Sequence, residues 1–169
     1  MNPNPTPSEQ RVHVYSLLKK FGTAMLVTRA GEDQLRVRPM AIAQVEDQGD
    51  VWFVTSVDTA KVHEIEDESR VNLVCQNDHS AYLSLEGRAR VVNDRAKLEE
   101  VWSEPMKVWF PGGKDDPAIT LIAVTLDSGE FWDNAGTQKF KYLFESAKAY
   151  LTGTTPDLED GSTHGRTAL

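Results

Sequence analysis

Three hydroxyl residues and one lysine lie close together at the end of a predicted strand and just after it: Thr55, Ser56, Thr59 and Lys61. A short helix is predicted to begin near Thr59, and the first turn of a helix offers unpaired backbone N–H groups and a partial positive charge. Hydroxyl groups donate hydrogen bonds to anionic oxygens, and a lysine adds a point charge. The cluster therefore predicts a cradle for a phosphate group.

The neighbouring strand carries further groups suited to an anionic ligand. Arg36 and Arg38 add positive charge. Pro39 cannot donate a ladder hydrogen bond, so it favours an edge or a bulge where the backbone is free to meet a ligand. Together with the hydroxyl cluster, these residues predict a site that holds a phosphorylated planar cofactor.

A second interpretation of the same residues stays open. Hydroxyl residues that follow a strand also cap helices, and arginines on a strand usually face solvent. The chain has no glycine-rich loop of the P-loop or dinucleotide type that would decide between the two interpretations.

Two apolar, strand-like runs must position the cluster, Leu35 to Val45 and Val51 to Thr55. The polar turn from Asp47 to Asp50 joins them, so we expect the two runs to pair as an antiparallel hairpin.

The remaining chain predicts short strands, peripheral helices and one irregular loop. Thr6, followed by Pro7 and Glu9, is typical of a helix start, and Gly22 should end that helix. Further strands are expected at Thr23 to Arg29, Arg70 to Cys75, Ala81 to Val92, Leu121 to Leu126 and Glu130 to Asp133, and further helices at Thr59 to Asp67, Arg95 to Trp102 and Thr137 to Gly153.

Glycine and proline mark two special places in this pattern. Gly87, inside a predicted strand, suggests a bulge or a close backbone approach. Three prolines and two glycines between Pro105 and Pro117 argue against regular structure there. That loop carries Trp109 and Phe110, which are too apolar to be left without a partner.

The element order favours a mostly β fold, an antiparallel barrel with peripheral helices. Six or seven strands with short turns lack the strand and helix alternation of a parallel sheet, and closure into a barrel removes sheet edges. A chain of 169 residues suits one domain. We expect it over residues 8–153, between a disordered N-terminus at residues 1–7 and a flexible tail at residues 154–169.

Composition narrows the function classes. A net charge of −8 and a pI near 5.0 argue against non-specific binding to nucleic acid or anionic membranes. No apolar run is long enough to span a membrane, and the N-terminal residues lack the pattern of a signal peptide. The lone cysteine, Cys75, fits a reducing compartment, so we expect a cytoplasmic protein.

The sequence does not predict a metal site. The four histidines show no ligand spacing, and the Asp115-Asp116 pair beside Pro117 is more typical of a turn. Haem would need an axial ligand, and the spacing of the histidines indicates none. A deazaflavin with an acidic tail would need more basic residues than Arg36, Arg38 and Lys61.

Five segments, in their order and spacing, carry a resemblance to a known family. They are Arg36 to Met40, Trp52 to Ser56 followed by Lys61, Leu83 to Gly87, Trp109 to Pro117, and Glu130 to Asp133. With them the chain resembles the flavin-binding split-barrel proteins of the pyridoxamine 5′-phosphate oxidase-like superfamily, and within it the branch of general stress proteins. The resemblance extends from Ser8 to Gly153 and implies an antiparallel split β-barrel.

The resemblance also implies a homodimer with FMN in each of two grooves between the subunits. By position, the isoalloxazine edge would be lined by Arg36, Val37, Arg38, Pro39 and Met40, the ring and ribityl chain by Val54 and Thr55, and the phosphate by Thr55, Ser56, Thr59 and Lys61. Tyr82 would lie near the flavin, and Trp109, Phe110 and Trp132 of the partner subunit would cover its ring. Indole and phenyl groups match the apolar faces of a flavin, and a lysine suits its phosphate.

One departure from the family pattern bears on activity. Pyridoxamine phosphate oxidases carry arginine and histidine after the tryptophan that corresponds to Trp132, whereas this chain continues from Asp133 to Lys139 with neither. A second phosphate site and oxidation of pyridoxine vitamers are therefore not favoured. A flavin-dependent oxidoreductase acting on a small molecule and a non-catalytic flavin-binding protein for storage or sensing both stay open.

Overall fold

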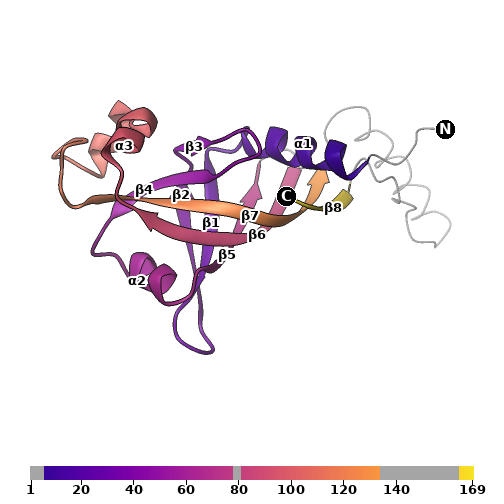
Figure 1. The fold of residues 1–169 in the computed structure, drawn as a ribbon, viewed down its shortest axis with the longest axis horizontal. Helices are drawn as coiled ribbons and strands as arrows, with labels where there is room; N and C mark the ends of the chain where they lie inside the picture. The colour runs from indigo at the N-terminus through magenta and orange to yellow at the C-terminus, as the bar shows by residue number, and fades with distance from the viewer. Residues whose placement is uncertain (1–5, 78–80, 134–163) are drawn as a thin grey trace, which may run out of the picture.

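One curved antiparallel sheet holds most of the chain in a computed structural model that describes residues 6–77, 81–133 and 164–169 (Figure 1). Its strands are β1 (Thr23–Arg29), β2 (Leu35–Ala41), β3 (Gln44–Val45), β4 (Val51–Ser56), β5 (Arg70–Gln76), β6 (Ala81–Val92), β7 (Ile119–Asp133) and β8 (His164–Ala168). The strand order is β2-β1-β5-β6-β7-β4-β3, with β8 paired to β7. Because β2 also contacts β4, the sheet curls toward itself. This confirms the predicted mostly β split barrel.

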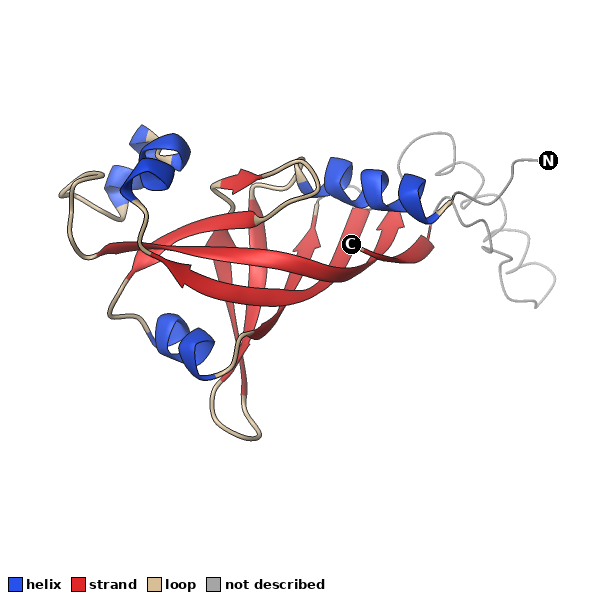
Figure 2. Ribbon diagram, in the orientation of Figure 1, coloured by secondary structure: helices blue, strands red, loops and turns tan. Residues whose placement is uncertain are grey.

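The helices lie outside the sheet (Figure 2). They are α1 (Pro7–Leu18), α2 (Ala60–Asp67), α3 (Arg95–Val101) and a 3₁₀ helix, η1 (Glu104–Val108). At the start of α1, Thr6 and Glu9 form the predicted capping box, although Thr6 and Pro7 fall in the segment expected to be disordered. The helix ends at Leu18, before the predicted stop at Gly22, while Phe21 still packs into the core.

Two apolar clusters stabilise the sheet, one on each of its faces. In β4, Val51 and Phe53 pack into the main cluster, whereas Trp52 and Val54 pack toward a second cluster with Leu98 of α3. Both faces of β4 are therefore covered, which explains its continuous apolar sequence.

The predicted hairpin from Leu35 to Thr55 is only partly present. The run from Leu35 to Val45 breaks after Ala41, so that β2 pairs with β1 and only the short β3 pairs with β4. The connection between β1 and β2 is tight, with Ala30 N–H donating to Gln34 O at 2.7 Å, and closing this short loop costs little chain entropy. Pro39 lies on β2, at one end of the strand order, as its missing N–H predicts.

The two strands predicted at the end of the sheet form one strand, β7. Its Asp127-Ser128-Gly129 segment has the composition of a turn, but Gly129 and Ser128 continue the ladder with β6, opposite Leu85 and Glu86. The predicted bulge at Gly87 is confirmed by a register shift at Glu86/Gly87. A Cβ atom on Gly87 would lie 2.4 Å from the backbone oxygen of Thr125, so only glycine fits there.

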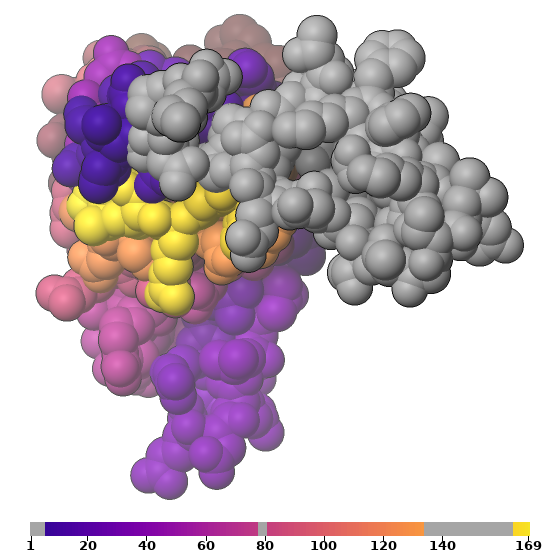
Figure 3. All heavy atoms as spheres, turned by 90° about the vertical axis from the view of Figure 1, so that its right-hand side faces the viewer, coloured from indigo at the N-terminus to yellow at the C-terminus, as the bar shows by residue number. Residues whose placement is uncertain are grey.

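Two further predictions need correction. Residues 164–168, expected in a flexible tail, form β8, which Figure 3 shows (yellow) between α1 (indigo) and the end of β7 (orange). Thr167 fixes β8 to α1 by donating to Pro7 O at 3.2 Å. The loop from Pro105 to Pro117, expected to be irregular, begins within η1, which extends to Val108. The predicted helix from Thr137 to Gly153 lies outside the described residues.

Candidate functional site

Lys61 and Thr55 meet where the chain leaves β4 and enters α2. Lys61 Nζ donates to Thr55 Oγ1 at 3.0 Å, and Thr55 is only 4% exposed. Burial lowers the pKa of Lys61, the nearby charge of Arg38 lowers it further, and Glu64 partly offsets both. Within the described part of the chain, the Lys61 ammonium group has no salt-bridge partner. A half-buried cation in this situation favours an anionic ligand.

The hydroxyl of Thr59 does not cap α2, in contrast to the alternative interpretation of this segment. Thr59 is the N-cap residue, but its Oγ1 donates to Ser56 O at 3.0 Å and makes no capping bond. The hydroxyl therefore stabilises the turn between β4 and α2, and leaves the first turn of α2 without a side-chain cap.

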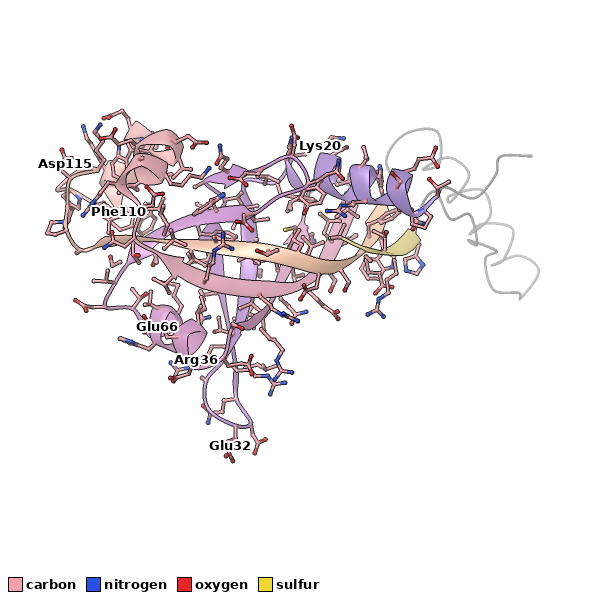
Figure 4. The ribbon with its side chains drawn as sticks, viewed as in Figure 1. Lys20, Glu32, Arg36, Glu66, Phe110 and Asp115 are labelled. Atoms are coloured by element: carbon pink, nitrogen blue, oxygen red, sulfur yellow. The ribbon has the colours of Figure 1, made fainter. Side chains whose placement is uncertain are left out.

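Arg36 and Arg38 point toward α2, where they meet the buried carboxylate of Glu64, as Figure 4 shows for the labelled Arg36. Arg38 Nη2 lies 2.7 Å from Glu64 Oε2, and Arg36 Nη1 lies 3.1 Å from Glu64 Oε1. Thr28 of β1 completes the network, because its hydroxyl donates to Glu64 and accepts from Arg38. Together, Arg36, Arg38, Lys61, Glu64 and Thr28 are called the cation cluster below.

Glu64 is ionised in this cluster. Burial alone would raise the pKa of this carboxyl, but the hydrogen bonds from Thr28 and Arg38 and the charges of Arg38 and Arg36 outweigh it, so the pKa is lowered. The cluster thus has three cationic side chains and one carboxylate.

The sequence did not single out Thr28 and Glu64. Thr28 is 1% exposed and lies in register with Arg36 on the neighbouring strand. A signal existed for each: Thr28 shares the buried face of β1 with Ala24 and Leu26, and Glu64 lies one helical turn after Lys61. A polar residue at a core-facing position requires a partner.

The other site residues expected on β2 and β4 divide between the two faces of the sheet, because side chains alternate along a strand. Thr55 faces the cluster, but Val54 packs toward the second apolar cluster. Met40 is buried in the main core, whereas Val37 and Pro39 are exposed on the outer face. Only part of the expected set can therefore present side chains to one ligand.

Tyr82 and Trp132 lie side by side at the far end of the sheet. They are register partners on β6 and β7 and are 42% and 36% exposed. His164 of β8 is the next register partner, and its ring stacks on Trp132 with centroids 5.2 Å apart and planes inclined by 11°. His164 Nε2 lies 2.7 Å from Glu130 Oε1. Tyr82, Trp132 and His164 are called the aromatic row below; the sequence had not marked His164.

The cation cluster and the aromatic row lie at opposite ends of β7. Thr55, which accepts from Lys61 of the cluster, pairs with Thr120 near the start of β7. Tyr82 of the aromatic row pairs with Trp132 near the end of β7. A single copy of the chain therefore does not bring the two groups together.

Trp109 and Phe110 behave differently from each other. Phe110 packs on the second apolar cluster of its own chain, with its ring centroid 6.4 Å from that of Trp102. Trp109, by contrast, is 79% exposed. Both were predicted, with Trp132, to reach a partner subunit, but of these two loop residues only Trp109 is free of its own core.

Other chemistry has little support in the described residues. They contain no group of three or more histidine, cysteine, aspartate or glutamate side chains that could hold a metal ion. Asp116 accepts from Ala118 N–H at 2.9 Å, as expected for a turn. Burial raises the pKa of the Cys75 thiol to about 12, so it is a poor nucleophile. No helix in the described ranges is long and apolar enough to cross a membrane.

The curved antiparallel sheet places the chain among the split-barrel proteins, and comparison with known proteins identifies its family. The model of the family described as pyridoxamine 5′-phosphate oxidase like matches residues 9–157. The chain therefore belongs to the pyridoxamine 5′-phosphate oxidase-like family.

Its relatives include general stress proteins. Over 78 residues it is 30% identical to general stress protein 26 of Bacillus subtilis, a match that covers 44% of this chain and 55% of that protein. A Jannaschia sp. CCS1 structure assigned as general stress protein 26 is 29% identical, with a TM-score of 0.71 over 95% of this chain and 97% of that chain. The general stress FMN/FAD binding protein of Xanthomonas citri is 28% identical, with a TM-score of 0.66 over 77% and 92% of the two chains.

Replacing Thr28 by valine tests the cation cluster. Thr28→Val removes a donor to buried Glu64 and should lower the free energy of unfolding by about 1 to 3 kcal/mol at pH 7. Because the folded-state pKa of Glu64 is below its unfolded value, this loss should be complete above the unfolded pKa and should fade as the pH falls through the folded pKa. Urea unfolding between pH 3 and 7 would measure it, with Thr23→Val on the exposed face of β1 as the control. A pH-independent loss would contradict the assignment.

Proposed function

We propose that the protein is an FMN-binding flavoprotein of the general stress protein type, with the FMN phosphate held at the cation cluster. The observation that carries the proposal is Lys61, a half-buried ammonium group that donates to Thr55 and has no salt-bridge partner in the described chain. The ammonium group has three N–H donors but uses one acceptor among the described residues. A phosphate dianion would supply further acceptors and a balancing negative charge.

The geometry changes one part of the expected assignment. Arg36 and Arg38 gather with Lys61 around Glu64, so we assign both arginines to the phosphate end of FMN rather than to the edge of its ring. The outer edge of β2 around Val37 and Pro39, which pairs with no strand of the described sheet, is then left to line the ring. The name of the Xanthomonas citri relative, an FMN/FAD binding protein, supports a flavin as the ligand.

We also propose a homodimer in which each flavin lies between two subunits. The aromatic row is suited to a flat ring, but it lies at the opposite end of β7 from the cation cluster, so a second copy would have to bring it to the ring. The outer face of the sheet also exposes a set of apolar side chains, which a second copy would cover: Met25, Leu35, Val37, Val74, Tyr82 and Trp132.

The flavin would supply the redox chemistry, and the chain would bind and orient it. Our proposal is an oxidoreductase acting on a small molecule, with a storage or sensing protein as the alternative. Pyridoxamine phosphate oxidase-like activity is less favoured, because the basic residues that would bind a second phosphate are missing after Trp132. The cytoplasmic location expected from the single cysteine stays a prediction.

The phosphate assignment predicts a selective loss on mutation of Lys61. Lys61→Ala should weaken FMN binding by about 1.5 to 3 kcal/mol, the range for a hydrogen bond to a charged group. Riboflavin, which lacks the phosphate, should bind the wild type and the variant almost equally. Flavin fluorescence titration measures both affinities. The matched lysine control is Lys20→Ala, because Lys20 is exposed in the turn after α1. Equal losses of FMN and riboflavin affinity would show that Lys61 does not act through the phosphate.

The dimer assignment predicts an effect of Trp109, the most exposed aromatic residue of the described chain. Trp109→Ala should shift the protein toward monomer and weaken FMN binding together, by roughly tenfold each, because a large aromatic anchor is lost from the interface. Size-exclusion chromatography with light scattering, with and without FMN, measures both. Val12→Ala, an exposed apolar residue of α1, is the control. A wild type that is monomeric with bound FMN would exclude the shared site.

Steady-state turnover separates the enzyme from the binding protein. If the protein is an oxidoreductase, reduced nicotinamide and a quinone or nitroaromatic acceptor should turn over at least about tenfold faster with the FMN-loaded protein than with equal free FMN. Stopped-flow reduction and reoxidation provide the measurement. A rate no faster than that of free FMN across these acceptors would favour storage or sensing.

A further inference from the structure

Glu64 already accepts hydrogen bonds from Arg36 and Arg38, two of the donors that an anionic ligand at the cation cluster would use. Glu64 is 7% exposed, and its carboxylate uses both oxygens, Oε1 toward Arg36 at 3.1 Å and Oε2 toward Arg38 at 2.7 Å. Thr28 donates to Oε2 as well. The described chain thus contains a buried internal anion in contact with two of the three cations of the cluster.

The contacts of the two arginines differ in strength. Arg38 is held on both sides, by Thr28 and by Glu64, and its side chain is 19% exposed. Arg36 makes one longer bond to Glu64 and is 54% exposed. Arg36 is therefore the arginine that can leave Glu64 most easily for a second anion.

We propose that Glu64 is an internal competitor of the bound phosphate, which occupies Arg36 and Arg38 in the ligand-free protein and thereby keeps the flavin exchangeable. This inference rests on the proposed FMN site. It makes Glu64 an affinity-determining residue that acts through the arginines.

The proposal requires stability and affinity to change in opposite directions when the charge of Glu64 is removed. Without the carboxylate, Arg36, Arg38 and Lys61 repel one another in a partly buried site, so the ligand-free protein becomes less stable. The same change removes the repulsion between the carboxylate and a phosphate dianion and frees arginine donors, so an anion binds more tightly. A purely structural role for Glu64 would lower stability and affinity together.

The test compares Glu64→Gln with Glu66→Gln, an exposed glutamate on the same helix. In phosphate-free buffer, Glu64→Gln should lower the melting temperature of the ligand-free protein and tighten FMN binding at least about tenfold. Inorganic phosphate should show the same tightening as a competitor of FMN, and riboflavin affinity should stay within about twofold. Glu66→Gln should change none of these quantities.

Glu64→Asp keeps the charge and provides a second variant that retains a buried partner for Arg38. Its shorter side chain should release Arg36, so its FMN affinity should fall between those of the wild type and Glu64→Gln. Unchanged or weaker FMN binding in both variants, with riboflavin unaffected, would overturn the inference and leave Glu64 as a residue that positions the arginines. A wild type that binds no FMN would instead refute the proposed function.

Discussion

The buried carboxylate of Glu64 is the constraint on which the candidate site depends. An ionised carboxyl at 7% exposure is tolerated only if its oxygens are satisfied, and here Thr28, Arg36 and Arg38 satisfy them. These partners come from β1 and β2, whereas Glu64 belongs to α2. The need to satisfy one carboxylate therefore joins the helix to two strands. It also fixes Lys61, one helical turn earlier, beside Thr55 at the end of β4.

The length of β7 then separates two groups of side chains with different chemistry. This strand of 15 residues begins beside the cation cluster and ends beside the aromatic row. The bulge at Gly87 lets β6 follow β7 over this length while the sheet bends. Charge gathers at one end and aromatic surface at the other. Under the proposed function, two copies of the chain would combine these opposite ends around a ligand with an anionic group and a flat ring.

Most elements could be predicted because their signals are local. The box formed by Thr6 and Glu9 started α1, and alternation along β1, β5 and β6 marked strands close to their observed bounds. Predictions were wrong where pairing between distant segments decided the outcome. Asp127 to Gly129 has the composition of a turn, yet the pairing of Ser128 and Gly129 with both β6 and β8 keeps this segment in β7. His164 to Ala168 has no strand signal, and only its pairing with β7 makes it one.

The sequence by itself determined the group of three hydroxyl residues and one lysine in the candidate site, because Thr55, Ser56, Thr59 and Lys61 are neighbours along the chain and their turn follows from local rules. It also determined the antiparallel barrel and the resemblance to the family. Only the tertiary structure decided that Glu64 and Thr28 belong to the site and that His164 stacks on Trp132. Thr28 and Glu64 are 36 positions apart, and a contact over that separation depends on how the strands pair and curl, which no local pattern specifies.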